Sequence, residues 1–298
     1  MTLRTIRRAR LVAIFLLLFI VTAVGYVTLD RWQRQTIFSV ELGEHRWWRD
    51  PPAGTEVFDL VLPQGDKVRA WYIQHPDPDA PTVLYLHGSR WNLNGSVFRM
   101  ERWVQMGHSL LAIDYRGFGD STQRLPSQAS VLGDARAALQ ELARRQPDPA
   151  RRFIYGHSLG GAVATQLAAQ SDMPPVAGLI LESTFTSIRD MIVTTQWSGV
   201  PGLGLLVTQP FDSADALARV RLPVLLLHGT GDRVVPHTMS DTLLAAAQAP
   251  EGLRRLVKLE GASHSGASRS SPVYDDAIRA FVQDATKAAQ HAQPSPSG

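Results

Sequence analysis

The sequence predicts an α/β domain built on a mostly parallel sheet and preceded by a membrane-spanning helix. Two observations carry this prediction. From residue 55 onward, apolar runs of strand length alternate with segments whose apolar residues recur at helical spacing. Before that point lie a basic flank and a long uncharged apolar run. Alternating strands and helices are typical of a parallel sheet that helices cover on both faces.

The predicted strands are continuously apolar, as expected for strands that are buried on both sides. They occupy residues 81–88, 109–115, 152–157, 177–183 and 222–229. The helical patterns between them cover residues 96–107, 130–145, 160–170 and 238–248. An alternating pattern around a Gln-Gly-Asp turn predicts an antiparallel hairpin at the start, and the chain closes with an apolar segment and a helix, residues 58–73, 253–264 and 274–290.

One part of the predicted domain fits neither pattern. Residues 185–212 are interrupted by glycine and proline, so we expect a short cap over the carboxyl edge of the sheet. The whole α/β domain is predicted over residues 55–290, and residues 291–298 are expected to form a disordered tail.

The N-terminal sequence is typical of a membrane-spanning segment. Residues 1–10 carry four arginines and no acid, and Leu11–Leu29 carry no charge. Nineteen helical residues rise about 28 Å, close to the hydrocarbon thickness of a bilayer. The basic flank predicts a cytoplasmic N-terminus, which puts the α/β domain on the outer side, the periplasm in a bacterium. Residues 30–54 are predicted to be a polar, aromatic connector.

A cleaved signal peptide is the alternative. Its apolar region would be Leu11–Val21, and Ala23-Val24-Gly25 would be the cleavage site. The apolar run continues past that site, which favours an uncleaved anchor.

Composition excludes several classes of function. The formal net charge is +3, but four of the positive charges are the arginines of residues 1–10. The other 288 residues have a net charge of −1, so no basic stripe is available to bind nucleic acid. The absence of cysteine excludes disulfides, thiolate metal sites and cysteine nucleophiles. No HExxH or other metal-ligand spacing occurs, so no metal is implied.

The stretch GHSLGG, residues 156–161, is the strongest functional signal. It lies between a predicted strand and a predicted helix, the context that a G-x-S-x-G turn requires to present its serine as a nucleophile. The glycines let strand and helix approach closely. Ser158 is therefore the candidate nucleophile, and a tight turn with a capping hydroxyl is the alternative.

A serine needs a base and an acid that orients the base. Asp232 and His264 each follow a predicted strand, in the order Ser, Asp, His that this arrangement requires. His264 would accept the proton of Ser158, and Asp232 would orient the imidazole. Glu182, which also ends a strand, is the best rival for the acid.

Other titratable residues near strand ends have a structural interpretation. We expect hydrogen bonds within the fold for His87, His157 and His228, and loop-fixing roles for Asp114 and Asp120.

The oxyanion formed during acyl transfer needs two backbone donors. We expect the Leu159 N–H, directly after the nucleophile, and a second amide in the loop after the strand at 81–88, assigned by position to Ser89.

Taken together, LHGS, DYRGFGDS, GHSLGG, ESTFTSIRDM, HGTGDRVVP and GASH make residues 55–285 resemble an α/β-hydrolase. The chain is most similar to membrane-anchored serine hydrolases of the Bem-like subgroup, related to monoglyceride-lipase-like and aminopeptidase-like enzymes. This resemblance implies the α/β-hydrolase fold with an eight-stranded sheet, a catalytic triad of Ser158, Asp232 and His264, and no cofactor.

The chain departs from the subgroup after the first His-Gly, where Ser89-Arg90-Trp91-Asn92 replaces small residues. A cation and a large ring near the pocket suggest that Arg90 and Trp91 bind an acidic or aromatic group of the substrate. A solvated Arg90 and a packing Trp91 are the alternative.

These features predict a membrane-anchored serine hydrolase that cleaves carboxylic esters or thioesters, with a small-molecule or lipid ester as substrate. A peptidase or amidase with the same triad is one alternative. A non-catalytic binding protein on a hydrolase fold is another.

Overall fold

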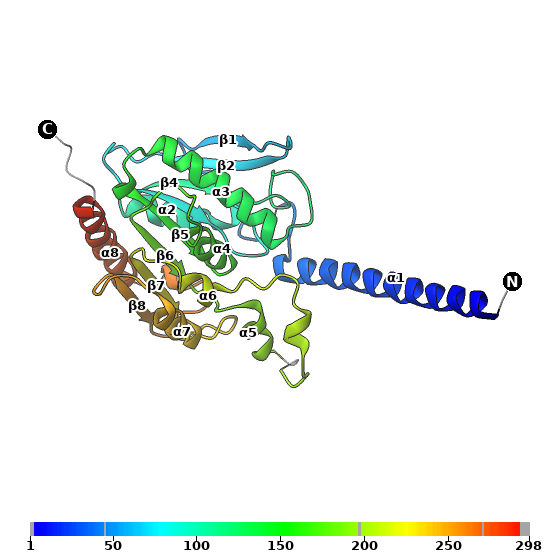
Figure 1. Cartoon of the computed structure of the whole chain (residues 1–298). Helices are drawn as coiled ribbons and strands as arrows, with labels where there is room; N and C mark the ends of the chain where they lie inside the picture. The colour runs from blue at the N-terminus through cyan, green and yellow to red at the C-terminus, as the bar shows by residue number, and fades with distance from the viewer. Residues whose placement is uncertain (1–2, 45, 196–197, 270, 293–298) are drawn as a thin grey trace.

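An eight-stranded sheet forms the centre of the protein in the computed structural model, which describes residues 3–44, 46–195, 198–269 and 271–292 (Figure 1). The strand order is β1-β2-β4-β3-β5-β6-β7-β8. β2 runs antiparallel to β1 and β4, and all other neighbours are parallel. The predicted mostly parallel sheet is confirmed. The strands are Glu56–Val61, Lys67–Ile73, Thr82–Leu86, Ser109–Ile113, Arg152–His157, Gly178–Glu182, Val224–Gly229 and Arg254–Leu259.

Each predicted helix of the α/β domain is present. In chain order α2 to α8 are Val97–Gln105, Gln128–Arg145, Leu159–Ala168, Ile188–Val193, Ser213–Leu217, Thr238–Ala246 and Ser271–Ala292. α8 extends two residues past the expected domain end at 290, because its helical hydrogen bonding continues, and residues 293–298 of the expected tail lie outside the described residues.

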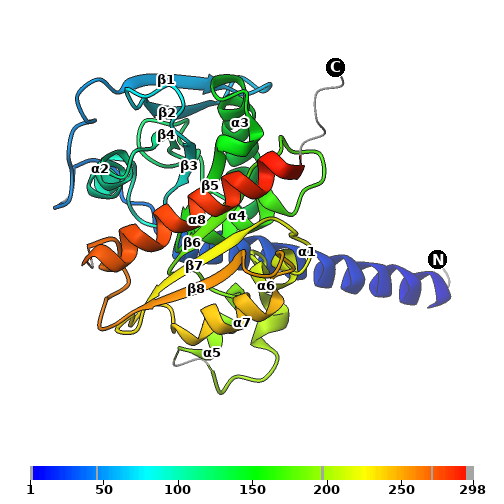
Figure 2. The same ribbon diagram turned by 90° about the vertical axis from the view of Figure 1, so that its left-hand side faces the viewer.

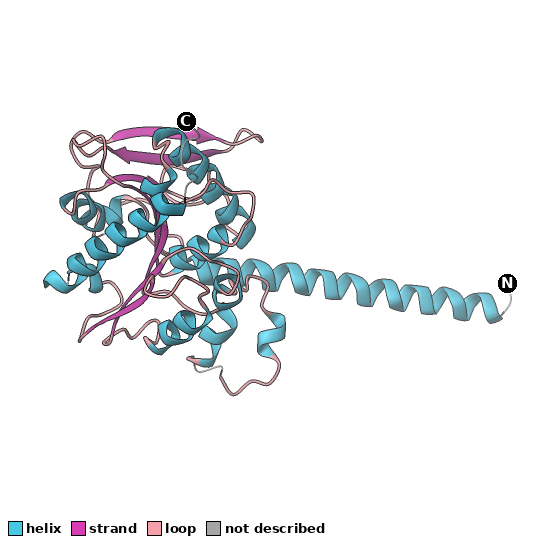
Figure 3. Cartoon of the chain, turned by 60° about the vertical axis from the view of Figure 1, so that its left-hand side comes forward, coloured by secondary structure: helices cyan, strands magenta, loops and turns pink. Residues whose placement is uncertain are grey.

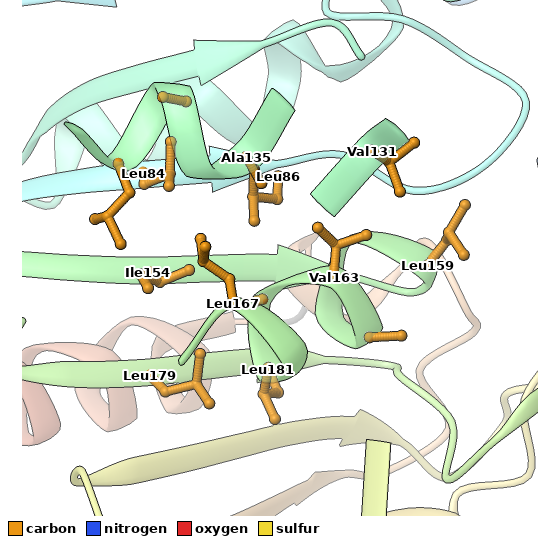
Figure 4. Packing of buried hydrophobic residues seen from close by; sticks show 14 of the residues in the cluster. Leu84, Leu86, Val131, Ala135, Ile154, Leu159, Val163, Leu167, Leu179 and Leu181 are labelled. Carbon is orange, nitrogen blue, oxygen red and sulfur yellow. The ribbon is translucent and has the colours of Figure 1, made fainter. Parts of the chain in front are cut away.

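Helices cover both faces of the sheet, which explains why the central strands β3, β4, β6 and β7 are mostly apolar at successive positions. Along β3, Leu84 and Leu86 belong to one apolar layer, whereas Val83 and Tyr85 belong to the other. The first layer packs against α3 and α4 (Figure 4), and the second packs against α2 and α8, which crosses the face of the sheet in Figure 2. Burial on both faces fixes the strand register, since a slip by one residue would exchange the layers.

The N-terminal helix α1 is a single helix over Leu3–Phe38 and projects away from the sheet (Figure 3). The apolar part of α1 is exposed, and it is long and apolar enough to cross a membrane. A signal sequence near the N-terminus would meet the same criteria. The helix does not stop at Leu29, so residues 30–38 of the expected connector are helical.

The last turns of α1 are helical because the body binds them. The Gln33 carboxamide donates to the Leu206 carbonyl at 2.7 Å and accepts the Thr208 N–H at 2.8 Å. Arg34 Nε donates to the Pro126 carbonyl at 2.7 Å. Phe38 is 0% exposed and packs edge-on against Phe211, so the helix ends inside the apolar core.

The expected cap corresponds to the segment between β6 and α6. Its two ends are buried through Phe185 and Phe211. The Ile188 N–H donates to the Pro210 carbonyl at 2.8 Å, which closes the base of the segment. Between these fixed ends lie α5 and a 3₁₀ turn at Leu203–Leu206.

Replacing Phe38 with alanine should remove about 3–5 kcal/mol from the free energy of unfolding, because a fully buried ring leaves a cavity. Urea unfolding of the detergent-solubilised full chain measures this. Phe19→Ala, the same change in the exposed part of α1 (Phe19 is 71% exposed), is the control and should leave the unfolding of the body unchanged. Equal, small effects of both variants would show that the end of α1 does not support the core.

Candidate active site

A strained turn between β5 and α4 presents Ser158. Its φ of 54° and ψ of −120° lie in a region that side-chain-bearing residues rarely adopt. A Cβ on Gly156 would stand 2.2 Å from the Gly160 carbonyl oxygen, and a Cβ on Gly160 would stand 2.1 Å from the Leu86 carbonyl oxygen. β5, α4 and β3 are therefore in backbone contact at this turn, which requires glycine at both positions.

The predicted base and acid converge on this serine from two other loops. His264 Nε2 lies 3.1 Å from Ser158 Oγ, and His264 Nδ1 lies 2.7 Å from Asp232 Oδ2. Asp232 follows β7 and His264 follows β8, so the parallel strands bring both loops to the same edge. With Nδ1–H donating to the carboxylate, the Nε2 lone pair faces the serine hydroxyl.

Asp232 is fully buried and held as a carboxylate. Its Oδ1 accepts the Val234 and Val235 N–H groups at 2.8 and 2.9 Å. Burial alone would raise the pKa of Asp232, but hydrogen bonds from His228 and His264 outweigh that effect and hold the pKa well below its usual range. The acid therefore stays ionised throughout the physiological range.

His228 is a residue of the site that the sequence analysis assigned only a structural hydrogen bond. Its Nε2 lies 3.1 Å from both Asp232 Oδ2 and the Val235 carbonyl oxygen. Both partners are acceptors, so Nε2 carries a proton. Its Nδ1 lies 2.5 Å from Ser240 Oγ. The feature of the sequence that could have identified His228 is its position near the end of β7, four residues before Asp232.

The rival acid Glu182 lies elsewhere. It is fully buried, and its Oε2 accepts the hydroxyl groups of Tyr155 and Tyr274 at 2.6 and 2.7 Å. Its Oε1 lies 3.7 Å from Arg99 Nε, which forms a buried ion pair. Glu182 thus faces a tyrosine and arginine cluster rather than His264.

Arg99 and His157 connect that ion pair to the base. His157 Nε2 lies 3.1 Å from Arg99 Nη2 and also 3.1 Å from the His264 carbonyl oxygen. In a neutral ring this nitrogen either accepts from the guanidinium or donates to the carbonyl. Burial and the charge of Arg99 hold the pKa of His157 well below its usual range, so its ring is neutral. Arg99 could not be recognised from the sequence, because an arginine in a predicted helix shows no sign of being buried beside the site.

A cavity of about 300 Å³ opens over Ser158 and His264. Ser89, Arg90 and Trp91 line it together with the buried Arg99. The other expected oxyanion donor, the Leu159 N–H, belongs to the first residue of α4 and so has no partner within the helix.

Arg90 differs from a freely solvated cation. Its Nε lies 3.4 Å from Glu41 Oε1, and its side chain is 57% exposed. Its backbone has a positive φ of 78°, its N–H donates to the Phe38 carbonyl at 2.9 Å, and its carbonyl accepts the Glu41 N–H at 2.9 Å. The loop that carries Ser89 is therefore bonded to the residues that follow α1.

Of the remaining strand-end residues, Asp114 binds the backbone just after this loop, whereas Asp120 pairs with β2. Asp114 is buried and its Oδ1 accepts the Leu93 N–H at 2.9 Å, while burial raises its pKa to about 7. His87 lies 3.4 Å from the same carboxyl oxygen, and burial lowers its pKa to about 4. Asp120 pairs with Arg69 at 3.0 Å.

Among the described residues, no group of three or more acidic or histidine side chains is placed to hold a metal ion.

Known proteins with similar sequences place the chain in a family. A family model described as serine aminopeptidase, S33, matches residues 77–212. The uncharacterized protein Rv2307c of Mycobacterium tuberculosis is 36% identical over 78% of this chain and 80% of its own length. The α/β-hydrolase domain-containing protein WAV2 of Arabidopsis thaliana is 36% identical over 64% and 67%. The chain belongs to the α/β-hydrolase family.

Within this family the chain falls in the Bem-like subgroup. Protein bem46 of Schizosaccharomyces pombe is 36% identical over 55% of this chain and 56% of its own length. Among solved structures, the esterase PF2001 of Pyrococcus furiosus has a TM-score of 0.62 at 17% identity, covering 84% of this hydrolase and 97% of the esterase. At that identity the esterase shows the fold alone.

Substituting Gly160 with alanine should abolish or severely impair folding, because the new methyl group would overlap the Leu86 carbonyl of a buried strand. Gly133→Ala is a matched control in α3, where the nearest atom to a Cβ is Arg116 Nη2 at an ordinary 3.7 Å. We expect the control to keep or slightly raise stability, by up to about 1 kcal/mol. Soluble yield and thermal unfolding of both variants measure this, and two equally stable variants would contradict the close approach.

Proposed function

We propose that this α/β-hydrolase is a membrane-anchored serine hydrolase that cleaves carboxylic ester or thioester bonds of lipid-like or acylated substrates through an acyl-enzyme. The observation that carries the proposal is the hydrogen-bond chain from Ser158 through His264, both of which line a cavity, to the buried, ionised Asp232. A turn that only joined a strand to a helix would need neither partner.

In the proposed reaction, Ser158 Oγ attacks the substrate carbonyl carbon while His264 Nε2 takes the hydroxyl proton. The tetrahedral intermediate then expels the alcohol or thiol, which takes the proton from His264. Water then attacks the acyl-enzyme carbonyl carbon while His264 Nε2 takes its proton. The bond to Ser158 Oγ breaks, Oγ takes the proton from His264, and the carboxylic acid is released. Asp232 holds the imidazole orientation and stabilises the imidazolium, and the proposed role of His228 is to keep Asp232 in place.

The proposed oxyanion donors are the N–H groups of Leu159 and Ser89. The first lies at the positive end of the α4 dipole, directly after the nucleophile. The second belongs to a loop whose next residue, Arg90, is fixed to Phe38 and Glu41 by two backbone hydrogen bonds. We assign Arg90 and Trp91 to substrate binding because they line the cavity. Arg99 adds a buried positive charge at the same wall.

The length and exposure of α1 support the membrane-surface part of the proposal. Phe38, whose carbonyl binds Arg90, lies nine residues beyond the apolar run, which is about 14 Å along a helix axis. An active site at that height suits substrates held in a bilayer. With the basic flank retained in the cytoplasm, the catalytic domain would face the periplasm. An intact Met1 end in the mature membrane protein tests this against signal cleavage.

Peptide or amide hydrolysis is a second candidate, favoured by the family description of serine aminopeptidase. The same triad would act, with His264 protonating an amine as it leaves. Comparing an acyl ester with the matching acyl anilide separates the two candidates.

Fluorophosphonate labelling of the membrane fraction tests the nucleophile. Labelling should occur in the wild type and disappear in Ser158→Ala, and ester turnover should fall by roughly 10⁴-fold or more. Ser171→Ala, an exposed serine in the turn after α4, is the control and should label like the wild type. Persistent labelling of a folded Ser158→Ala variant would refute the assignment.

The identity of the acid is tested with two isosteric changes. Asp232→Asn should lower kcat by roughly 10³–10⁴-fold with little loss of stability, since the amide presents the wrong hydrogen-bond partner to His264. Glu182→Gln should instead lower the free energy of unfolding by about 3 kcal/mol or more, because Arg99 loses its buried counter-charge. The measurements are steady-state ester hydrolysis and urea unfolding. The reverse pattern would make Glu182 the catalytic acid.

A further inference from the structure

Large apolar side chains are exposed on the cap, where neither the core nor the cavity uses them. Leu205 is 90% exposed, and Val193, Val200 and Leu206 are each about half exposed or more. We call these four residues the cap patch. They lie in one segment between β6 and α6, whose two ends are fixed in the core. Large apolar side chains exposed on a segment with fixed ends are candidates for a contact surface.

The cap patch is tied to a defined height along α1. The Gln33 side chain binds the backbone on both sides of Val207, at the Leu206 carbonyl and the Thr208 N–H. Gln33 lies four residues past Leu29, the end of the apolar run, which is about 6 Å along the helix axis. The headgroup layer outside the hydrocarbon core is of the same thickness. Figures 1 and 3 both show the cap beside the point where α1 leaves the body.

A second marker lies at the same height. Trp32, adjacent to Gln33 in the helix, is 57% exposed. Tryptophan prefers the interface between hydrocarbon and water, where its ring is buried and its N–H stays hydrated. The exposure of Trp32 therefore agrees with a headgroup layer at the level of α1 that the bonds of Gln33 join to Leu206.

We propose that the cap patch inserts into the headgroup layer of the same bilayer that α1 spans, with a phospholipid surface as its partner. This rests on the proposed anchoring of α1. The body is then held against the membrane at two places, the helix and the cap. Its orientation relative to the surface is fixed, because the bonds of Gln33, Arg34 and Phe38 prevent α1 from acting as a loose tether.

Single-cysteine labelling of the full chain tests this directly, since the sequence contains no cysteine. An environment-sensitive fluorophore is attached at one of three positions. Leu205→Cys places it on the cap, and Leu18→Cys places it inside the apolar run of α1. Val273→Cys places it on the exposed start of α8, away from α1 (Figure 2). Each labelled protein is reconstituted into phosphatidylcholine and phosphatidylglycerol vesicles with and without nitroxide-labelled lipid. We expect strong quenching at position 18, intermediate quenching at 205 and none at 273.

The three positions separate the ways in which the proposal can fail. Quenching at position 18 without quenching at position 205 keeps α1 as an anchor but overturns the insertion of the cap. Shielding of position 205 by a second copy or another protein overturns the insertion as well. Equal quenching at 205 and 273 indicates unspecific adsorption and also overturns it. No quenching at 18 refutes the anchoring itself, and the insertion with it.

Discussion

The backbone contact between β5, α4 and β3 at the turn around Ser158 is the constraint on which the site depends. Gly156 and Gly160 permit the contact, and the strained backbone of Ser158 follows from it. The strain is held from two sides, because the Ser158 N–H donates to the Glu182 carbonyl at 2.9 Å and the Thr184 hydroxyl donates to the Ser158 carbonyl at 2.8 Å. The end of β6 and the residue two positions after it therefore hold a conformation that would be unfavourable alone.

Two buried charged groups, Asp232 and Arg99, lie near the proposed base. Asp232 receives hydrogen bonds from two backbone amides and two histidines, so it is an anion that needs no further compensation. Arg99, balanced by Glu182, lies on the other side, with the neutral His157 between its guanidinium and the backbone of His264. The base is thus positioned between fixed charges, which suits a group that must both accept and release a proton.

The strands, the turn at Ser158 and the convergence of Asp232 and His264 could be predicted from the sequence because each depends on local pattern and strand order. The helical residues after Leu29 could not. Asp30, Arg31 and Gln33 are polar and read as a connector, and only partners far along the chain, such as Thr208, explain their helix. Likewise His228 and Arg99 looked ordinary, since a histidine at a strand end and an arginine in a helix gain their importance from burial beside the site.

The end of α1 is part of the fold of the body and not an appendage to it. Phe38 completes the apolar core, and its carbonyl holds the N–H of Arg90, the residue after the proposed oxyanion donor Ser89. Arg90 has a positive φ that an arginine adopts only when its surroundings impose it, and the two hydrogen bonds to residues 38 and 41 are such surroundings. The helix therefore has two roles that are usually separate: it supports one wall of the cavity, and it sets the height of that cavity above the end of its own apolar run. A displacement of α1 relative to the body would change the loop after β3 before it disturbed Ser158 or His264, which are held by other strands.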